Sequence, residues 1–396
     1  MSRMEPIWDT LCQRIHMDFK ARDLGLYVHI PFCQKRCHFC AFYLTSHREN
    51  RIQDFLSALA QEISLYSQSE TCHRFPISTI YFGGGTPTSL ESVQLASILD
   101  LIHQHFTVDP AAEITIEADP ETVSRSSLQE LHDAGVTRLS LGVQSLEESE
   151  WQQLGRLGQM ETVSRAMADV KDSGFTNVSL DVMYGLPGQT LETWQYSLEK
   201  VLELFPTHLS CYALTIEEGT KFHRDVREGK LGSRDVELET AMHEQAVTCL
   251  ESAGYYQYEV SNFAKAGWEC QHNLRYWSGL DYLGLGPSAQ SYVCGMRFGN
   301  ISDLSTYSHS LQTQDLPVDF LDALSVKDVA RERVIFGLRL NKGVPIHELT
   351  IFENDQLWQS TVDRLIEDGL LSVDHQYLKV TSLGRQFIDT LALQLS

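Results

Sequence analysis

The sequence has little positive charge and no long apolar run, and each absence excludes a class of function. The 396 residues carry 31 Lys and Arg against 53 Asp and Glu, a formal net charge of −22. Such a charge repels polyanions, so we do not expect the protein to bind or modify nucleic acid. No stretch approaches the roughly 18 apolar residues of a membrane span, so we do not expect an integral membrane protein.

The amino terminus also lacks the features of a secretory signal. In the stretch MSRMEPIWDTLCQRIHMDF, no apolar segment is followed by a cleavage site of small residues. The nine cysteines are an odd number, with three close together and six scattered. In a chain without an export signal, this distribution favours metal binding over disulfides and predicts a cytoplasmic protein.

The chain does contain a regular alternation of predicted strands and helices. Six short runs rich in Val, Ile, Leu and Tyr are typical of strands, and they occupy residues 26–31, 78–85, 113–120, 138–145, 178–187 and 209–216. Between them, stretches such as 51–66, 92–106 and 191–205 repeat apolar residues at intervals of three and four, which indicates helices. Six strand–helix units predict an α/β fold with a parallel sheet, and six is two short of a closed eightfold barrel. We therefore expect an open, partial (β/α)6 barrel.

The pattern changes after the sixth predicted strand. The last part of the chain shows helices near 327–339 and 354–368 and a hairpin pattern at 370–381, which is typical of a winged-helix-like α+β domain. Winged helices often bind DNA, but this tail is not markedly basic, so we expect a structural lid or a docking role. We predict four parts: an arm at 1–23, a barrel core at 24–255, a connecting segment at 256–310 and the winged-helix-like domain at 311–396.

The most specific motif is the stretch PFCQKRCHFCAF, which spaces Cys33, Cys37 and Cys40 as Cys-x3-Cys-x2-Cys directly after the first predicted strand. Thiolates are soft ligands that suit iron–sulfur clusters and zinc. Zinc would need a fourth ligand, which His29 or His38 could supply. A 4Fe–4S cluster can instead use three cysteines and leave one iron open. We expect a cluster ahead of zinc, and both ahead of simple core packing, because charged residues interleave with the cysteines.

Further polar and small residues stand where the other predicted strands end. Glycines follow the second strand, and Glu117, Gln144 and Asp181 lie in the third, fourth and fifth. In βα-barrels the carboxyl ends of the strands form the rim at which chemistry occurs. Strand ends are also loop starts, where polar residues are common, so no single residue is decisive. The cysteines after the first strand and these four positions together, at five strand ends, point to a site.

The cysteine spacing, with an aromatic residue directly before the last cysteine and after the first strand of a partial barrel, resembles the radical S-adenosylmethionine superfamily. The resemblance implies that the open iron binds the amino and carboxylate groups of S-adenosylmethionine, whose sulfonium can be cleaved to a 5′-deoxyadenosyl radical. It also implies that Gly84, Gly85 and Thr86 meet the amino-acid end of this cofactor and that Glu117 bonds its ribose hydroxyls. The other implied contacts are Tyr27, Phe39, Gln144, Arg156, Asp181 and Ala213.

A closer resemblance covers roughly residues 24 to 390. The stretches YVHIPFC, YFGGGTPT, DVMYGLPGQT, YEVSNFAKAGWECQHNLRYW and DYLGLGPSA together resemble the family of oxygen-independent coproporphyrinogen III oxidase and its relative, the haem chaperone. The oxidase has a longer amino-terminal arm and a further cysteine two positions after the third, where this chain has Phe42. The resemblance therefore favours the chaperone. The alternative is an enzyme that decarboxylates coproporphyrinogen III oxidatively to protoporphyrinogen IX.

The chaperone branch carries a His-Asn-x-x-Tyr-Trp motif, which is His272, Asn273, Tyr276 and Trp277 here. Neutral imidazole is a common axial ligand of haem iron, and aromatic rings pack on porphyrin faces. From residue type alone, a buried hydrogen-bonding role for His272 fits better than a haem role. The resemblance implies as partners haem or another porphyrin, a haem-acceptor protein and an electron donor such as a flavodoxin or ferredoxin.

Some positions argue against a simple transfer of roles. The chaperone pattern has an aspartate, a histidine and a histidine at the positions of Ala41, Gly158 and Gln290, so the roles of those side chains are in doubt here. The stretch GLGPSA fits the dinucleotide fingerprint G-x-G-x-x-A, but it lacks a strand–turn–helix context and a suitable acidic residue. We therefore expect no dinucleotide site.

Overall fold

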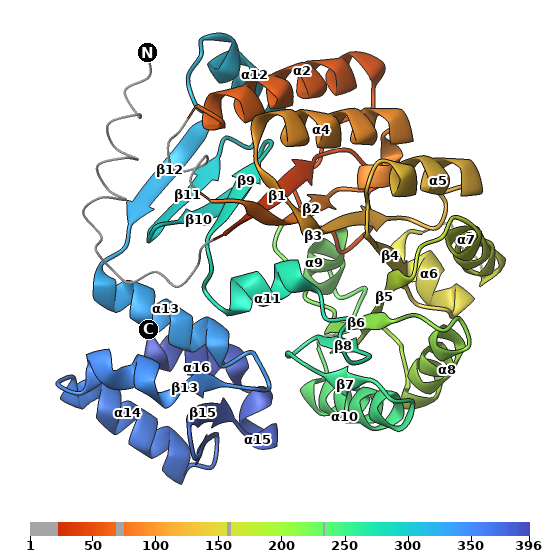
Figure 1. Cartoon of the computed structure of the whole chain (residues 1–396). Coiled ribbons are helices and arrows are strands. Elements are labelled where there is room, and N and C mark those ends of the chain that lie inside the picture. Colours follow the sequence, from red (N-terminus) through yellow and green to blue (C-terminus); the bar gives the residue numbers. More distant parts are fainter. Residues whose placement is uncertain (1–22, 69–74, 157–159, 233) are drawn as a thin grey trace.

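The structure is a computed structural model that describes residues 23–68, 75–156, 160–232 and 234–396 (Figure 1). Apart from its last residue, the predicted arm lies outside these residues, and so does Gly158. Within the described ranges, no helix is both long and apolar enough to cross a membrane.

Six parallel strands stand side by side in sequence order at the centre of the molecule (Figure 1). They are β1 (Leu24–Ile30), β2 (Ile77–Gly84), β3 (Val108–Ala118), β4 (Arg138–Gln144), β5 (Asn177–Tyr184) and β6 (His208–Ala213). Each overlaps the predicted run, because apolar residues that are buried on a sheet leave a clear trace in sequence. The predicted α/β fold with a partial barrel is confirmed.

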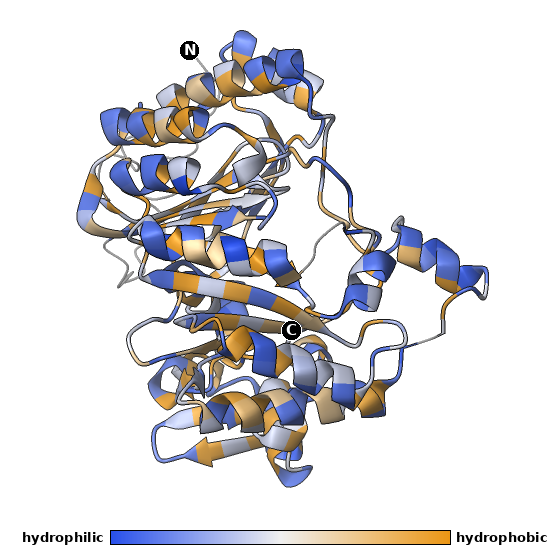
Figure 2. Cartoon of the chain, turned by 90° about the vertical axis from the view of Figure 1, so that its right-hand side faces the viewer, coloured by the Kyte–Doolittle hydropathy of each residue, from blue (hydrophilic) through white to orange (hydrophobic). Residues whose placement is uncertain are grey.

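Helices cover the outer face of this sheet. They are α2 (Glu49–Tyr66), α4 (Ser92–His105), α5 (Arg125–Asp133), α6 (Glu148–Leu154), α7 (Met160–Asp172), α8 (Leu191–Leu202) and α10 (Val236–Ser252). Helix α9 (Lys221–Arg227) lies instead at the cysteine loop, where the backbone N–H of Phe222 donates to the carbonyl of His38, and a short 3-10 turn, η1 (Pro87–Ser89), follows β2. In Figure 2 these helices carry hydrophilic and hydrophobic residues in alternation, as expected when one face lies on a sheet and the other in water.

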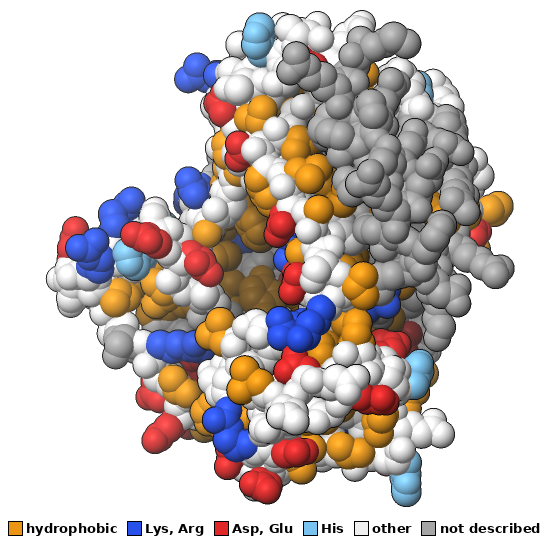
Figure 3. Space-filling view, turned by 90° about the vertical axis from the view of Figure 1, so that its left-hand side faces the viewer, with side chains coloured by type: hydrophobic (Ala, Val, Ile, Leu, Met, Phe, Trp, Pro, Cys, Tyr) orange, Lys and Arg blue, Asp and Glu red, His pale blue; other side chains and the backbone are white. Residues whose placement is uncertain are grey.

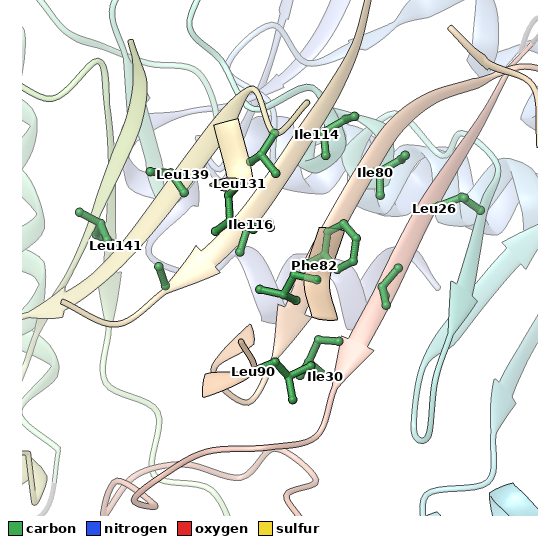
Figure 4. Packing of buried hydrophobic residues seen from close by; sticks show 14 of the residues in the cluster. Leu26, Ile30, Ile80, Phe82, Leu90, Ile114, Ile116, Leu131, Leu139 and Leu141 are labelled. Atoms are coloured by element: carbon green, nitrogen blue, oxygen red, sulfur yellow. The ribbon is translucent and has the colours of Figure 1, made fainter. Parts of the chain in front are cut away.

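The alternation of side chains along the strands separates the core from the site. Alternate residues of neighbouring strands pack under the helices, as Figure 4 shows for Leu26, Ile80, Phe82, Ile116 and Leu139. Because successive side chains on a strand point to opposite faces, the residues between them point into the barrel. These intervening residues include Tyr27, Tyr81, Glu117, Arg138, Ser140, Asp181 and Ser210. The same period-two pattern that builds the core therefore places polar side chains inside the barrel.

Further strands extend the sheet at both edges. They are β7 (Tyr256–Gln257) and β8 (Asn262–Ala264) beyond β6, and β9 (Tyr282–Leu285), β10 (Gln290–Val293), β11 (Met296–Asn300) and β12 (Val318–Ala323) beyond β1. Helices α11 (Gln271–Trp277) and α12 (Leu304–Gln312) accompany them. The GLGPSA stretch joins β9 to an antiparallel strand and not to a helix, so it lacks the context of a dinucleotide site.

The carboxyl-terminal part has a small sheet and a hydrophobic cluster of its own. Its elements are α13 (Val326–Gly337), β13 (Val344–Pro345), η2 (Ile346–Phe352), α14 (Gln356–Glu367), β14 (Leu371–Asp374), β15 (Tyr377–Val380), α15 (Ser382–Arg385) and α16 (Ile388–Leu395). The predicted hairpin is present as β14 and β15. Helix α13 lies against α11 of the connecting segment, and Arg297 of β11 pairs with Glu332 of α13 at 2.8 Å. The four-part division of the chain stays a prediction.

Candidate functional site

A cavity of about 710 Å³ lies at the carboxyl ends of the parallel strands. We call it the rim cavity. The three cysteines of the loop after β1 line it together with side chains from β2 to β6. Eight of the ten predicted S-adenosylmethionine contacts are on its lining: Phe39, Gly84, Gly85, Thr86, Glu117, Gln144, Arg156 and Asp181. Of the other two, Tyr27 lines a second cavity, and Ala213 pairs with Tyr184 at the end of β6.

The cysteine loop is held by contacts with the strand ends. Cys33 Sγ lies 3.2 Å from Thr86 Oγ1, at the start of the turn after β2. The backbone N–H of Cys40 donates to the carbonyl of Cys37 at 3.2 Å, which closes a turn, and the guanidinium of Arg36 donates to the carbonyl of Cys40. All three thiols are free and partly exposed, so they are accessible from the rim cavity.

The surroundings of the two nearest histidines bear on the choice between a cluster and zinc. Among the described residues, no three His, Cys, Asp or Glu side chains converge on one point where a metal ion could bind. Zinc requires its ligands within about 2.3 Å of one centre, whereas a 4Fe–4S cluster is held by thiolates on separate irons. His38 Nδ1 lies 2.6 Å from the carbonyl of Gln153. His29 is almost fully buried between Tyr27 Oη and the carbonyl of Tyr43. The alternative of zinc with one of these histidines is therefore not supported.

Bare backbone at Gly84 and Gly85 lets the turn after β2 approach the cysteine loop. Gly84 has a φ of +110°, and a Cβ there would lie 2.7 Å from the imidazole of His29. A Cβ on Gly85 would overlap the carbonyl oxygen of Phe32, the residue before the first cysteine. Backbone atoms cannot move aside as a flexible side chain does. Glycine is thus required at 85 for steric reasons, in addition to any contact with a ligand.

Replacing Gly85 by alanine is expected to lower the free energy of unfolding by about 1–3 kcal/mol, because the new methyl group displaces the Phe32 backbone. Chemical denaturation of the full chain measures this. Gly232→Ala is the matched control, since no described atom lies within 4 Å of a Cβ built there. Equal stabilities of the two variants would contradict the steric role of Gly85.

Two carboxylates face the cavity from inward positions of β3 and β5. Glu117 accepts hydrogen bonds from Tyr81 Oη at 2.8 Å and from the backbone N–H of Gly84 at 3.3 Å. Burial, and secondarily the charge of Asp181, raises the pKa of Glu117 to about 7. Asp181 accepts from Ser140 Oγ at 3.0 Å and from Ser179 Oγ at 3.0 Å, and burial raises its pKa as well. Both groups are fixed in orientation and can accept hydrogen bonds from a ligand.

Arg156 and Gln144 line the cavity from the segment after α6 and from the end of β4. Arg156 pairs with Asp119 at 2.5 Å, donates to the carbonyl of Gly142 at 2.7 Å, and lies 3.9 Å from Cys37 Sγ. Gln144 has a φ of +69°, an unfavourable conformation for any residue other than glycine. Its side chain accepts from Tyr212 Oη. Backbone strain that persists at a rim position is typical of functional sites.

Sequence reasoning missed several residues of this cavity, notably Arg138, Tyr212 and Asn262. Arg138 is 1% exposed, and its Nε has no hydrogen-bond partner among the described residues. A signal was available: the arginine starts a strand whose alternate residues Leu139 and Leu141 are apolar, so it had to point to the opposite face. The unpaired donor is available to an acceptor group of a bound molecule.

Comparison with known proteins gives a consistent result. The Radical SAM superfamily matches residues 27–201, and the HemN C-terminal domain matches residues 324–387. Heme chaperone HemW of Bacillus subtilis (strain 168) is 34% identical over 365 residues, which are 91% of this chain and 95% of the relative. The chain belongs to the heme chaperone HemW family of radical SAM proteins.

Other relatives of the HemW family extend the likeness. Heme chaperone HemW of Mycobacterium tuberculosis (strain ATCC 25618 / H37Rv) is 34% identical over 94% of both chains. Among solved structures, coproporphyrinogen III oxidase (HemN) from Escherichia coli, a radical SAM enzyme, has a TM-score of 0.84 at 27% identity and covers 98% of this chain and 93% of its own. Membership of the radical SAM superfamily implies a 4Fe–4S cluster and S-adenosylmethionine, and both predicted cofactors are confirmed at this level.

The residues of the His-Asn-x-x-Tyr-Trp motif lie in three different places in the structure. His272 is fully buried, with Nδ1 2.8 Å from Thr79 Oγ1 and Nε2 2.8 Å from Tyr276 Oη. Both ring nitrogens are therefore engaged within the protein. Asn273 lines the rim cavity, whereas Tyr276 and Trp277 line the second cavity. Of the positions that depart from the chaperone pattern, Ala41 and Gln290 also line the second cavity.

Proposed function

We propose that this protein is a haem chaperone, which binds haem, carries a 4Fe–4S cluster with S-adenosylmethionine, and passes haem to an acceptor protein. The observation that carries the proposal is the similarity to proteins named heme chaperone HemW over nine tenths of the chain. Phe42, which replaces the additional cysteine expected of the oxidase, supports the same choice. Haem or another porphyrin and a haem-acceptor protein are therefore the proposed partners.

In this proposal the rim cavity is the cluster and S-adenosylmethionine site. Cys33, Cys37 and Cys40 would hold three irons and leave the fourth to the amino and carboxylate groups of S-adenosylmethionine, which would supply radical chemistry when bound. Gly84, Gly85 and Thr86 offer backbone and hydroxyl groups to its amino-acid end. Glu117 accepts from its ribose hydroxyls. The proposed remaining contacts are Tyr27, Phe39, Gln144, Arg156, Asp181 and Ala213.

A reduced cluster needs an electron donor, and the surface beside the cysteines suits an acidic one. Lys35 and Arg36 are exposed between Cys33 and Cys37, which provides positive charge next to the cluster site of a protein whose net charge is −22. Small acidic donors such as a flavodoxin or a ferredoxin fit this local charge. We propose that exchange with such a donor and with the haem acceptor takes place in the cytoplasm, without nucleic acid as a partner.

The alternative function is the oxidative decarboxylation of coproporphyrinogen III. Its support is the TM-score of 0.84 with coproporphyrinogen III oxidase. A shared fold does not decide between binding and catalysis, because function depends on the site and its substrate. The relatives named heme chaperone are more similar in sequence, at 34% against 27% identity, so the chaperone is the better supported function.

One reconstituted sample tests both functions. Titration with hemin is expected to give a saturable Soret band, and the haem-loaded protein is expected to transfer haem to apomyoglobin. An unrelated acidic protein of similar net charge is the control for adventitious hemin. Anaerobic incubation with coproporphyrinogen III, S-adenosylmethionine and a reductant is expected to give no protoporphyrinogen. Formation of that product would favour the enzyme, and a band no stronger than that of the control would reject the chaperone.

A further inference from the structure

A second cavity, of about 540 Å³, lies between the sheet extension, helix α11 and helix α13. We call it the aromatic cavity. Ala41, Phe42 and Tyr43 of the cysteine loop form one wall, and Phe42 is also on the lining of the rim cavity. The two cavities are therefore neighbours on either side of that loop. Figure 3 shows that the molecule is hollowed on the side of β12 and α13, with hydrophobic side chains at the base of the hollow.

Aromatic rings dominate the lining of this cavity. From the sheet come Tyr27, Tyr282 and Tyr292, from α11 Tyr276 and Trp277, and from α13 Phe336. The rings of Tyr276 and Tyr282 meet edge to face at 4.5 Å, and those of Trp277 and Phe336 lie 6.4 Å apart. Its volume lies in the range of about 300–1,000 Å³ that is usual for cofactor sites. Packed rings offer a flat aromatic ligand a large apolar contact area.

Positive charge and unpaired donors accompany these rings. Arg297 from β11 and Arg333 from α13 both line the cavity, and Arg297 pairs with Glu332 at 2.8 Å. The Nε of Arg333 and the Nε1 of Trp277 are buried, and neither has a hydrogen-bond partner within the described part of the chain. A buried donor without a partner is costly, so such groups point to an acceptor that arrives with a ligand. An arginine fork suits a carboxylate in particular.

From these observations we infer that the aromatic cavity binds a tetrapyrrole, with its ring against the aromatic side chains and its propionate carboxylates on Arg333 and Arg297. This inference rests on the proposed function and assigns a place to the haem. It also explains the divided motif. Tyr276 and Trp277 contact the ligand, whereas His272 acts as a positioning residue that fixes α11 to Thr79 of β2.

The carboxylate contact can be tested with two probes, hemin and hemin dimethyl ester, which differ only in esterification of the propionates. The full-length wild type is expected to bind hemin about tenfold or more tightly than the ester, because each ester group loses a charge-assisted hydrogen bond. Arg333→Gln is expected to weaken hemin binding about tenfold and to leave the affinity for the ester nearly unchanged. Arg297→Gln is best made together with Glu332→Gln, so that no unpaired carboxylate remains.

Two further variants complete the design. Phe336→Ala is expected to weaken hemin and ester alike, since it removes ring contact and leaves the arginines in place. Arg125→Gln is the control, because Arg125 is an exposed residue of α5 that pairs with Asp172, and it is expected to behave as the wild type. Circular dichroism and thermal unfolding show whether each variant is folded.

The outcomes separate the inference from the proposed function. If the wild type binds hemin saturably but does not distinguish it from the ester, the inference is overturned while the chaperone function stands. The same holds if folded Arg333→Gln and Phe336→Ala variants bind hemin like the wild type. If the wild type binds no hemin above an unrelated acidic protein, the proposed function fails and the inference fails with it. If the arginine variants do not fold, the affinities of the wild type for hemin and for its dimethyl ester still test the inference. Equal affinities would overturn it.

Discussion

Replacing Cys33, Cys37 or Cys40 singly by alanine is expected to leave the anaerobically reconstituted protein almost without iron and sulfide, where the wild type holds about four of each per chain. A 4Fe–4S cluster with one open iron needs three thiolates, and the loop contains three. No spare thiolate can therefore replace a lost one. The three lie within one short loop on the rim cavity, and the two histidines nearest to it in sequence are engaged elsewhere. Iron and sulfide analysis, with the brown absorbance of the sample, measures the loss.

Cys249→Ala is the matched control for these variants. Cys249 is also free and partly exposed, but it lies on α10, so its removal is expected to leave the iron content unchanged. Zinc in place of iron and sulfide in the wild type would contradict the cluster. So would a cysteine-loop variant that keeps the full iron content. Because the readout is elemental analysis, the result does not depend on any assay of haem transfer.

The second large effect concerns a buried carboxylate away from the rim. Glu62 of α2 is fully buried and accepts hydrogen bonds from Tyr307 Oη at 2.6 Å, from Asn300 Nδ2 at 2.6 Å and from the backbone N–H of Gly286 at 2.7 Å. It thereby joins α2 to the turn after β9, to β11 and to α12. Glu62→Ala is expected to lower the free energy of unfolding by about 3–5 kcal/mol, because it leaves three buried donors unpaired and a cavity behind.

Glu62 also makes the stability depend on pH in a defined direction. Burial raises its pKa to about 7 in the folded protein, against about 4.3 in an unfolded chain. Between these values the folded state holds a proton that the unfolded state has released, so the free energy of unfolding falls as the pH rises. The contribution of Glu62 is full below its unfolded pKa and lost above about pH 7, and over the whole range it amounts to about 4 kcal/mol.

Comparison with Glu62→Gln isolates this contribution. Glutamine keeps the size of the side chain and cannot ionise. The free energy of unfolding of the variant, relative to that of the wild type, is therefore expected to rise by about 3 kcal/mol from pH 5 to pH 8. It is also expected to be more stable than Glu62→Ala at both values. Urea denaturation at a series of pH values provides the measurement. A constant difference between glutamine variant and wild type across this range would show that Glu62 does not titrate there.

The sequence reveals the residues of the first prediction but not the residue of the second. The cysteine loop could be found from spacing alone, because all three ligands come from one short segment and metal chemistry restricts which residue types serve. Glu62 gave no such signal: in sequence it is one of many acidic residues on an amphipathic helix. Its partners lie 224 to 245 residues further along the chain, and only the packing of α12 and the sheet extension onto α2 buries it.

The sequence by itself determined the six strands, the partial barrel, the cysteine motif, the family and its cofactors. These depend on period-two apolar patterns and on short motifs, which are local properties of the chain. Only the tertiary structure decided that β9 to β12 extend the sheet, that His272 uses both nitrogens inside the protein, and that Tyr276 and Trp277 face an aromatic cavity with Arg297 and Arg333. The physical reason is that burial, hydrogen-bond partners and cavities arise between segments far apart in the chain, and no local pattern records which segments will meet.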